Sequence, residues 1–145
     1  MSSNKKELDY TNKWLYNGDI FESDSIGDNY GFVYRITNKI SGKKYIGKKF
    51  FWFKKTLPPL KGKTRKRRSL VESDWKVYYG SNDELKDDVK NLGEETFSRE
   101  ILVLCRTKGE CSYYEAERQF SENALLSEDY YNSFIGCKIH RNHLR

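Results

Sequence analysis

The stretch GFVYRITNKISGKKYIG (residues 31–47) constrains the fold of this chain more than any other. In its first half, aromatic and β-branched residues alternate with a period of two, which is typical of a half-buried strand. The turn-forming sequence NKISG (38–42) follows, and a second short strand is predicted over 44–47. We therefore expect a β-hairpin that carries Tyr34 on one arm and Tyr45 on the other.

Two tyrosines on a hairpin could be ordinary core packing, because a tyrosine ring buries apolar area while its hydroxyl finds a partner. The spacing of the two tyrosines indicates a more specific pattern. The first tyrosine ends a G-x-x-Y sequence, and the second begins Y-I-G. This two-part pattern resembles the signature of the GIY-YIG nuclease family, with GFVY in place of GIY and a matching YIG. The resemblance implies an endonuclease in which Tyr34, Tyr45 and Gly47 belong to the catalytic site.

Length and cysteine content exclude several classes of protein. A chain of 145 residues predicts one domain. Its three cysteines lack a C-x-x-C pair, so they do not predict a secreted disulfide framework. No apolar run approaches the roughly 18 residues needed to cross a bilayer, and the N-terminus lacks the apolar segment of a signal peptide. We expect a soluble, cytoplasmic protein with no membrane partner.

The positive charge of the chain is concentrated in one segment. Ten of its 27 Lys and Arg residues lie within 48–68, which contains no Asp or Glu. Such a basic insertion predicts contact with the phosphates of DNA, although many basic runs are only solvated loops. The residues predicted to bind DNA are Lys48, Lys49, Lys61, Lys63, Arg65, Lys66, Arg67 and Arg68.

The same insertion contains four consecutive aromatic residues, FFWF (50–53), between pairs of lysines. These rings could be buried in the core or could form a stacking platform for bases, and burial is the favoured interpretation. Pro58 and Pro59 are expected to end any regular element that begins here.

The remaining elements predict an α+β fold. Ser81, with Glu84 in the capping-box position, predicts a helix over 81–93 with an apolar stripe of Leu85, Val89 and Leu92. The nearly continuous apolar sequence within FSREILVLC (97–105) predicts a central strand. We expect a small, mostly antiparallel three-stranded central sheet flanked by helices.

Two regions are expected along the chain. Residues 1–29 predict a loosely packed, polar and acidic N-terminal extension whose aromatic rings dock on the domain. Residues 30–145 predict a single nuclease-like domain that contains the basic insertion. The extension could serve as a dimer contact, a regulatory flap or simple packing, and the sequence does not choose among these roles or decide whether the chain is a homodimer.

A second capping box, Thr107 with Glu110, predicts another helix. Glu117 falls within its apolar stripe, where a carboxylate is costly unless it is paired or bound to a metal. It could pair with a buried basic side chain, but ligation of a hard divalent cation such as magnesium is the sharper hypothesis. The residues predicted to face inward are Tyr113, Glu117, Phe120 and Ala124, and those predicted to be exposed are Glu115, Arg118 and Glu122.

With Glu117, the resemblance to GIY-YIG nucleases covers most of residues 31–135. It implies that Glu117 holds Mg²⁺ or Mn²⁺ and that Asn132 orients the glutamate helix or its neighbours. It also implies that Tyr34 or Tyr45 takes a proton from the attacking water. Since a phenol has a pKa of about 10, nearby cations would have to lower that pKa.

The chain departs from the family pattern at one position. The family usually carries a phosphate-binding arginine about eight residues after the YIG glycine, and this chain has Lys55 there. Lysine supplies the charge but not the bidentate fork of arginine. Alternatively, an insertion has displaced the motif, and Arg65, Arg67 or Arg68 takes this role.

Two alternatives accompany the nuclease hypothesis. The stretches KYIGKK, ESDW, YYGS and IGCKIH resemble small, free-standing, homing-endonuclease-like members carried by phages, but the same scaffold could be a non-catalytic nucleic-acid-binding module. More distantly, a zinc-stabilised interaction domain could use Cys137, His140 and His143, which resemble a zinc half-site, with Cys105 or Cys111 as a fourth ligand. A basic tail is the favoured interpretation of that segment.

Overall fold

The predicted hairpin is present at the centre of the protein. The computed structural model describes residues 12–144. Strand β3 (Gly31–Asn38) pairs antiparallel with β4 (Lys44–Phe50), and the register sets Tyr34 opposite Gly47. The turn between the strands is closed by the Asn38 side chain, whose Oδ1 accepts hydrogen bonds from the backbone N–H groups of Ile40 (3.0 Å) and Ser41 (3.3 Å). The short second strand expected at the YIG sequence therefore continues through the first part of the basic segment.

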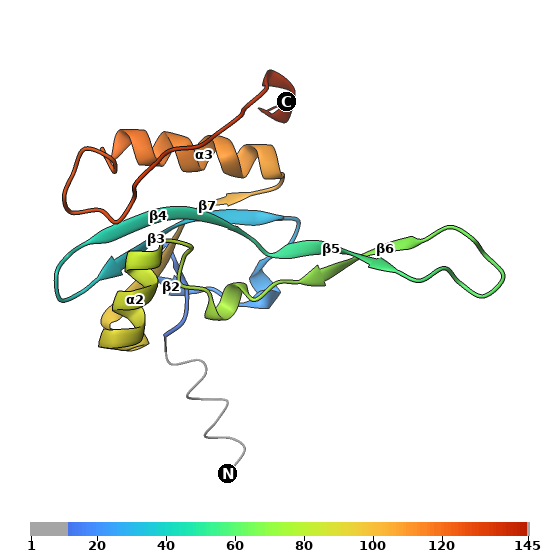
Figure 1. Ribbon diagram of the computed structural model, residues 1–145, viewed down its shortest axis with the longest axis horizontal. Coiled ribbons are helices and arrows are strands. Elements are labelled where there is room, and N and C mark those ends of the chain that lie inside the picture. The colour runs from blue at the N-terminus through green and yellow to red at the C-terminus, as the bar shows by residue number, and fades with distance from the viewer. Residues whose placement is uncertain (1–11, 145) are drawn as a thin grey trace, which may run out of the picture.

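The sheet is larger than the sequence indicates (Figure 1). Its strand order is β2-β1-β7-β3-β4, and β7 (Phe97–Cys105) occupies the predicted central position, antiparallel to β3. On the other side of β7 lie β1 (Leu15–Tyr16), which is parallel to it, and β2 (Asp19–Ile20), which is antiparallel to β1. The α+β class is confirmed, but the expected three-stranded antiparallel sheet is wrong, because two-residue strands are too short to show a period-two pattern.

The basic insertion forms a separate two-stranded sheet. Strands β5 (Trp52–Leu57) and β6 (Arg67–Glu72) pair antiparallel and project from the rest of the molecule as a long ribbon (Figure 1). Strand β5 ends immediately before Pro58 and Pro59, as expected. The four aromatic residues 50–53 differ in exposure, since Phe51 is fully buried whereas Phe53 is 48% exposed.

The two α-helices of the described residues cover opposite faces of the large sheet (Figure 1). Helix α2 (Asp83–Leu92) packs on the aromatic-rich face through Leu85. Helix α3 (Lys108–Ser121) packs on the other face, where Cys111 is buried in a smaller cluster. Short 3₁₀ segments make up the remaining helical turns, at Ser23–Ser25, Trp75–Val77, Glu94–Thr96 and Arg141–Leu144.

The helix caps agree only in part with the sequence predictions. Thr107 caps α3, as expected, and its side chain accepts a hydrogen bond from the Glu110 N–H at 3.1 Å. Helix α2 is capped by Asn82, not by Ser81, because the Asn82 side chain accepts from the Leu85 N–H at 2.9 Å. Adjacent polar residues offer two equivalent caps, and only the path of the chain decides between them.

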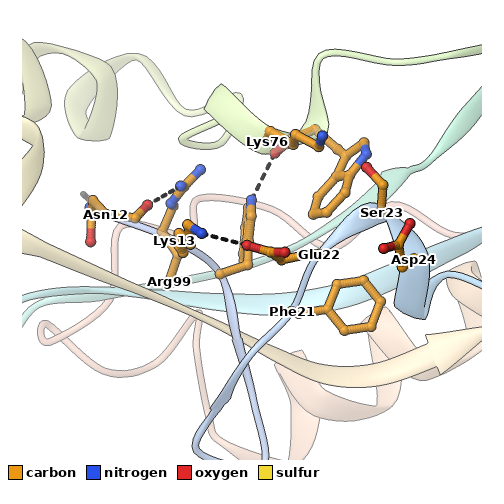
Figure 2. A pocket seen from close by; sticks show the side chains of 10 residues that line it. Asn12, Lys13, Phe21, Glu22, Ser23, Asp24, Lys76 and Arg99 are labelled. Carbon is orange, nitrogen blue, oxygen red and sulfur yellow. Dashed lines mark hydrogen bonds and ion pairs between the residues drawn. The ribbon is translucent and has the colours of Figure 1, made fainter. Parts of the chain in front are cut away.

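The segment before the hairpin packs on the sheet through aromatic residues. Trp14 and Phe21 are buried, and Trp14 donates its indole N–H to the Trp75 carbonyl oxygen at 2.7 Å. Figure 2 shows the pocket of about 350 Å³ that this segment lines together with Trp75 and Arg99. Arg99 is 3% exposed and lies between the rings of Trp14 (4.7 Å) and Tyr79 (4.3 Å), so it ties the segment to β7. Residues 1–11, which include the expected start of the extension, lie outside the described part.

Two negative findings apply to the described residues. No helix among residues 12–144 has both the length and the apolar character needed to cross a membrane. The three cysteines form no disulfide, with Cys105 and Cys111 buried and Cys137 exposed.

Candidate active site

A pocket of about 330 Å³ lies at the β4 edge of the sheet, where side chains from both faces meet. The hairpin contributes both of its motif tyrosines and Lys48, helix α3 contributes Glu115 and Gln119, and the turn before α2 contributes Ser81 and Asn82. The segment after α3 closes the pocket with Asn132, Ser133, Phe134 and Gly136. The sequence predicted Tyr34, Tyr45 and Asn132 as site residues, and the structure brings these three together.

Gly47 makes room for the hydroxyl of Tyr34. A Cβ atom built on Gly47 would lie 2.5 Å from the Tyr34 hydroxyl oxygen and 3.0 Å from the Tyr45 ring. The 2.5 Å distance is too short for a real side chain and the 3.0 Å distance is a tight contact, so a side chain at position 47 would have to displace the Tyr34 ring. The two motif tyrosines pack against each other, with ring centroids 6.1 Å apart. The G-x-x-Y and Y-I-G sequences thus form one physical unit.

Both tyrosines have raised pKa values. Burial is the main cause of the strong increase in the pKa of Tyr34, and the neighbouring Tyr78 and Tyr45 phenols and Glu115 add to it. Burial also raises the pKa of Tyr45, although a hydrogen bond with the Ser81 hydroxyl at 3.1 Å opposes the increase. The residues of the pocket therefore do not lower the phenol pKa values, contrary to what a tyrosine base requires near neutral pH.

Glu115 supplies the carboxylate of the pocket. Its side chain is 15% exposed, and its Oε1 lies 3.4 Å from the Nζ of Lys48. Burial raises the pKa of Glu115, and the Lys48 ammonium partly offsets this increase. A partly buried carboxylate beside a cation, in a pocket lined by polar side chains, is typical of catalytic and metal-binding positions. The sequence prediction had assigned Glu115 to the exposed face.

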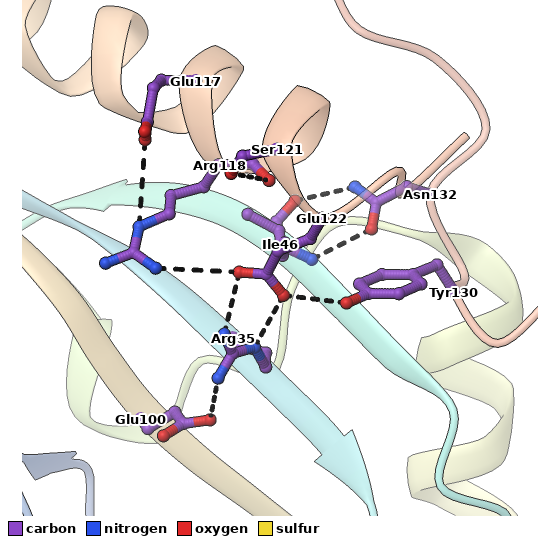
Figure 3. Close-up of polar contacts among 9 residues, drawn as sticks. All are labelled: Arg35, Ile46, Glu100, Glu117, Arg118, Ser121, Glu122, Tyr130 and Asn132. Atoms are coloured by element: carbon purple, nitrogen blue, oxygen red, sulfur yellow. Dashed lines mark hydrogen bonds and ion pairs between the residues drawn. The ribbon is translucent and has the colours of Figure 1, made fainter. Parts of the chain in front are cut away.

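The prediction that Glu117 faces inward is wrong. Its side chain is 51% exposed, and its Oε2 lies 3.9 Å from the Nε of Arg118 on the same helix (Figure 3). Tyr113 and Phe120, which were expected to accompany it, are also exposed. The inward-facing residues of α3 were predicted from apolar periodicity, and this prediction is wrong because the inward face of α3 is largely polar. That face carries Cys111, Glu115, Ala116, Gln119 and Glu122.

Asn132 holds the backbone of the YIG motif (Figure 3). Its Oδ1 accepts from the Ile46 N–H at 3.0 Å, and its Nδ2 donates to the Ile46 carbonyl oxygen at 2.8 Å. A side-chain amide thus replaces the peptide group of a neighbouring strand at the open edge of β4. Gln119 also donates to the Ile46 carbonyl oxygen, at 3.0 Å. Asn132 therefore contacts β4 directly, and Gln119 connects α3 to the same backbone group.

A partly buried ion-pair network fixes the end of α3 (Figure 3). The Arg35 guanidinium donates to both carboxylate oxygens of Glu122, at 3.2 and 2.8 Å, and to Glu100 at 2.8 Å. The Tyr130 hydroxyl also donates to Glu122, at 2.8 Å. Burial alone would raise the pKa of Glu122, but the hydrogen bonds from Arg35 and Tyr130 lower it overall. This network joins β3, β7 and α3 beside the pocket.

The basic residues predicted from the sequence are distributed over different environments. Lys48 is the cation among the described residues that line the pocket. Lys49 lies 2.7 Å from an Asp74 oxygen and over the Tyr78 ring. Lys55 is exposed on β5, opposite Ser69, and does not line the pocket. The insertion forms a ribbon, so the position eight residues after Gly47 is directed away from the pocket. The exposed loop and strand residues are Lys61, Lys63, Arg65, Lys66, Arg67 and Arg68.

The described residues contain no group of three or more His, Cys, Asp and Glu side chains that could hold a metal ion. His140 and His143 pack against each other, with ring centroids 5.2 Å apart, and Cys137 is exposed. Cys105 and Cys111 lie in the buried cluster beneath α3. The resemblance of the C-terminal segment to a zinc half-site therefore does not lead to a set of zinc ligands within residues 12–144.

Two comparisons with known proteins found matches to this chain. Residues 14–135 match a family model described as "Putative endonuclease segE, GIY-YIG domain". A protein of Enterobacteria phage T4 named "Putative endonuclease segE" is 34% identical over 103 residues, which cover 71% of this chain and 40% of the phage protein. The matched region thus spans less than half of that relative. No solved structure matches the chain significantly.

Proposed function

Because this chain belongs to the GIY-YIG family represented by the segE endonuclease model, we propose that it is a metal-dependent endonuclease that hydrolyses phosphodiester bonds in DNA. The observation that carries the proposal is the pocket at the β4 edge. There Tyr34 and Tyr45 converge with Lys48, Glu115 and Asn132 around about 330 Å³ of space. The pocket combines proton-transfer groups, a cation and a partly buried carboxylate, which are the groups that phosphoryl chemistry requires.

Glu115 fits the role of metal ligand. Magnesium is usually held in proteins by only one or two carboxylates, with waters and substrate phosphate oxygens as the other ligands. The Glu115 side chain is only 15% exposed, its closest cation is 3.4 Å away, and polar side chains line the space around it. When bound, Mg²⁺ or Mn²⁺ would supply positive charge at the scissile phosphate. The exposed Glu117 lacks this environment, so we assign the role to Glu115.

Either Tyr34 or Tyr45 is proposed to accept the proton of the attacking water. Both phenols line the pocket, but both have raised pKa values. Deprotonation of either therefore requires additional positive charge in the pocket, and Lys48 is one source of it. This requirement predicts slow turnover at neutral pH and faster turnover in alkaline solution.

Lys48 is proposed to bind the scissile phosphate in place of the family arginine. It immediately follows Gly47, and its ammonium group lies within reach of both the Ser112 hydroxyl (3.2 Å) and Glu115 (3.4 Å). As a compact charge it would attract a phosphate oxygen without the bidentate geometry of arginine. Asn132 and Gln119 would keep the backbone between Tyr45 and Gly47 in place while the substrate is bound.

The basic residues of the insertion are proposed to hold the DNA by its phosphates. Each cation that neutralises a phosphate releases condensed counterions, so affinity should fall steeply as salt concentration rises. A monomer that uses this single active site would cut one strand at a time, and we therefore expect nicked circles as the first product from a plasmid.

The test is incubation of the purified protein with supercoiled plasmid, in Mg²⁺ or Mn²⁺ and in a matched reaction with chelator. Conversion to nicked circles that occurs only with the metal supports the proposal. Salt-sensitive DNA binding without any cleavage would instead identify a non-catalytic DNA-binding module on the nuclease scaffold.

A further inference from the structure

We propose that the β5–β6 ribbon is an arm that enters the major groove of double-stranded DNA, which makes the duplex the substrate of the enzyme. The inference rests on the proposed function above and adds a way of holding DNA. Its first support is the shape of the ribbon, which projects beyond the sheet and both helices (Figure 1). Its second support is the arrangement of charge along the two strands.

The dimensions of the ribbon suit the major groove. Residues pair continuously from Trp52 opposite Glu72 to Leu57 opposite Arg67, which makes an arm about 20 Å long with its strands about 5 Å apart. The major groove of B-form DNA is about 12 Å wide and admits a two-stranded ribbon, whereas the minor groove is only about 6 Å wide. Undeformed duplex DNA can therefore receive the arm in the major groove alone.

The ribbon is basic on both of its faces. Residues directly opposite each other in an antiparallel pair lie on the same face, and the face alternates along each strand. Because Thr56 is opposite Arg68, that arginine shares a face with Lys54. Because Leu57 is opposite Arg67, that arginine shares the other face with Lys55. All four cations are exposed, and no acidic residue of the described chain forms an ion pair with them.

Cations on both faces of the ribbon distinguish insertion into a DNA groove from contact with a single phosphate backbone. A ribbon lying flat against one phosphate backbone would use the cations of only one face. A ribbon inside a groove has phosphates along both sides, so both faces gain from positive charge. The pair of Lys54 and Arg68 would then approach one backbone, while the pair of Lys55 and Arg67 approaches the other.

The tip of the ribbon combines charge with an exposed apolar side chain. A hollow of about 170 Å³ is lined by Leu60 together with Lys63, Arg65, Lys66 and Arg67. Leu60 is 53% exposed, and apolar side chains in the major groove contact the methyl group of thymine. The Arg67 Nε–H donates to the Pro58 carbonyl oxygen at 3.2 Å, which closes the tip loop.

The base of the ribbon is fixed to the protein core, so the arm has a defined position relative to the pocket. Phe51, immediately before β5, is fully buried against Trp75, with ring centroids 5.1 Å apart. At the end of β6, the Ser73 N–H donates to the Phe51 carbonyl oxygen at 2.7 Å. Strand β4, which carries Lys48 of the pocket, leads directly into this base. A duplex held by the arm would therefore be presented to the pocket in one orientation.

The two faces can be tested separately by the salt dependence of binding. One double variant is Lys54→Gln with Arg68→Gln, and the other is Lys55→Gln with Arg67→Gln. Fluorescence anisotropy with a labelled DNA duplex gives Kd over a range of salt concentrations. Each double variant should reduce the slope of log Kd against log salt by about 1 to 2, because each loses up to two phosphate contacts. The control is Lys86→Gln with Lys90→Gln, two exposed cations on α2, and its slope should not change.

Competition by groove ligands tests the second part of the proposal. Methyl green occupies the major groove and netropsin the minor groove, and both are cationic. We expect methyl green to weaken binding by about tenfold or more when it saturates the duplex, and netropsin to have a much smaller effect. If only one double variant reduces the slope of log Kd against log salt, the ribbon contacts DNA with one face and the proposed insertion into the major groove is wrong. Stronger competition by netropsin than by methyl green would also overturn the proposal.

Plasmid cleavage by the unchanged protein separates this inference from the proposed function. If the protein nicks plasmid but neither double variant alters the salt slope, the arm proposal is overturned while the nuclease stands. If the protein neither binds nor cuts duplex DNA, both proposals fall. Thermal melting of each variant should stay close to that of the parent, because all four side chains are exposed and the hydrogen bond that Arg67→Gln removes lies at the exposed tip of the ribbon.

Discussion

The hydroxyl of Tyr34 lies so close to Gly47 that a Cβ atom at that glycine would stand only 2.5 Å from it. The two residues are directly opposite in the β3–β4 register, so each half of the tyrosine motif depends on the other. The phenol fills the space where a side chain of β4 would otherwise be. Its ring is nevertheless one of the walls of the pocket.

Gly47→Ala should therefore destabilise the protein and reduce cleavage. The added methyl group must displace a buried ring, and overpacking of this kind costs about 1–3 kcal/mol. Urea unfolding of both proteins at pH 7 measures the difference. Gly136→Ala is the matched control, because its Cβ would meet no atom closer than 3.6 Å. Equal stability of the Gly47 and Gly136 variants would contradict the packing described for Tyr34.

Removal of the motif hydroxyl that acts as the base should abolish most of the cleavage. We expect at least one of Tyr34→Phe and Tyr45→Phe to lower the rate by roughly 100-fold or more while leaving duplex affinity nearly unchanged. Tyr113→Phe, on the exposed face of α3, should retain the parental rate. Single-turnover cleavage and anisotropy on the same duplex separate the two quantities. A parental cleavage rate in both motif variants would exclude a tyrosine base.

The cleavage rate of the unchanged enzyme should rise with pH. The pKa values of both phenols are raised, so near neutral pH only a small fraction of either is ionised. The rate should increase by up to about tenfold per pH unit from pH 6 to pH 8, in proportion to that fraction. Initial rates measured at constant ionic strength and metal concentration give the profile. A rate that stays flat or falls over this range would oppose the assignment.

Stability in acid should depend on the pair of Arg35 and Glu122. The pKa of Glu122 is lowered in the folded protein, so its contribution to stability is present above the ordinary glutamate pKa of 4.5 and is lost as pH falls through the folded value. Glu122→Gln should destabilise the protein by about 1–3 kcal/mol at pH 7, and the difference from the parent should shrink below about pH 4. Urea unfolding at both pH values measures this, with the exposed Glu117→Gln as control. A difference that does not change with pH would show that the network is not ionic.

The sequence predicted the parts of the fold that local patterns specify. The alternation over residues 31–37 and the buried run in 97–105 correspond to β3 and β7, because strands packed in the middle of a sheet show their period clearly. Strands β1 and β2 were missed because two-residue strands carry no pattern. The ribbon was missed because its side chains are exposed on both faces, so burial imposes no period on β5 and β6.

The sequence predicted which residues of the hairpin and of the segment after α3 reach the pocket. It did not predict which face of α3 is directed toward the pocket. Tyr34, Tyr45 and Asn132 reach the pocket, as expected. The inward orientation was predicted for Glu117 instead of Glu115, because the inward face of this helix contacts a polar pocket and Arg35 instead of an apolar core. Glu115, Gln119 and Glu122 follow helical spacing, so a search for polar periodicity would have found them.

The proposed mechanism depends most on Glu115 as the carboxylate of the catalytic pocket, and the decisive measurement compares it with Glu117 on the same helix. Glu115→Gln and Glu117→Gln make the same chemical change at positions that are 15% and 51% exposed. With supercoiled plasmid and Mg²⁺, we predict that Glu115→Gln loses at least about 100-fold in nicking rate while Glu117→Gln nicks at the parental rate. Loss of nicking in Glu117→Gln, with Glu115→Gln fully active, would contradict the account.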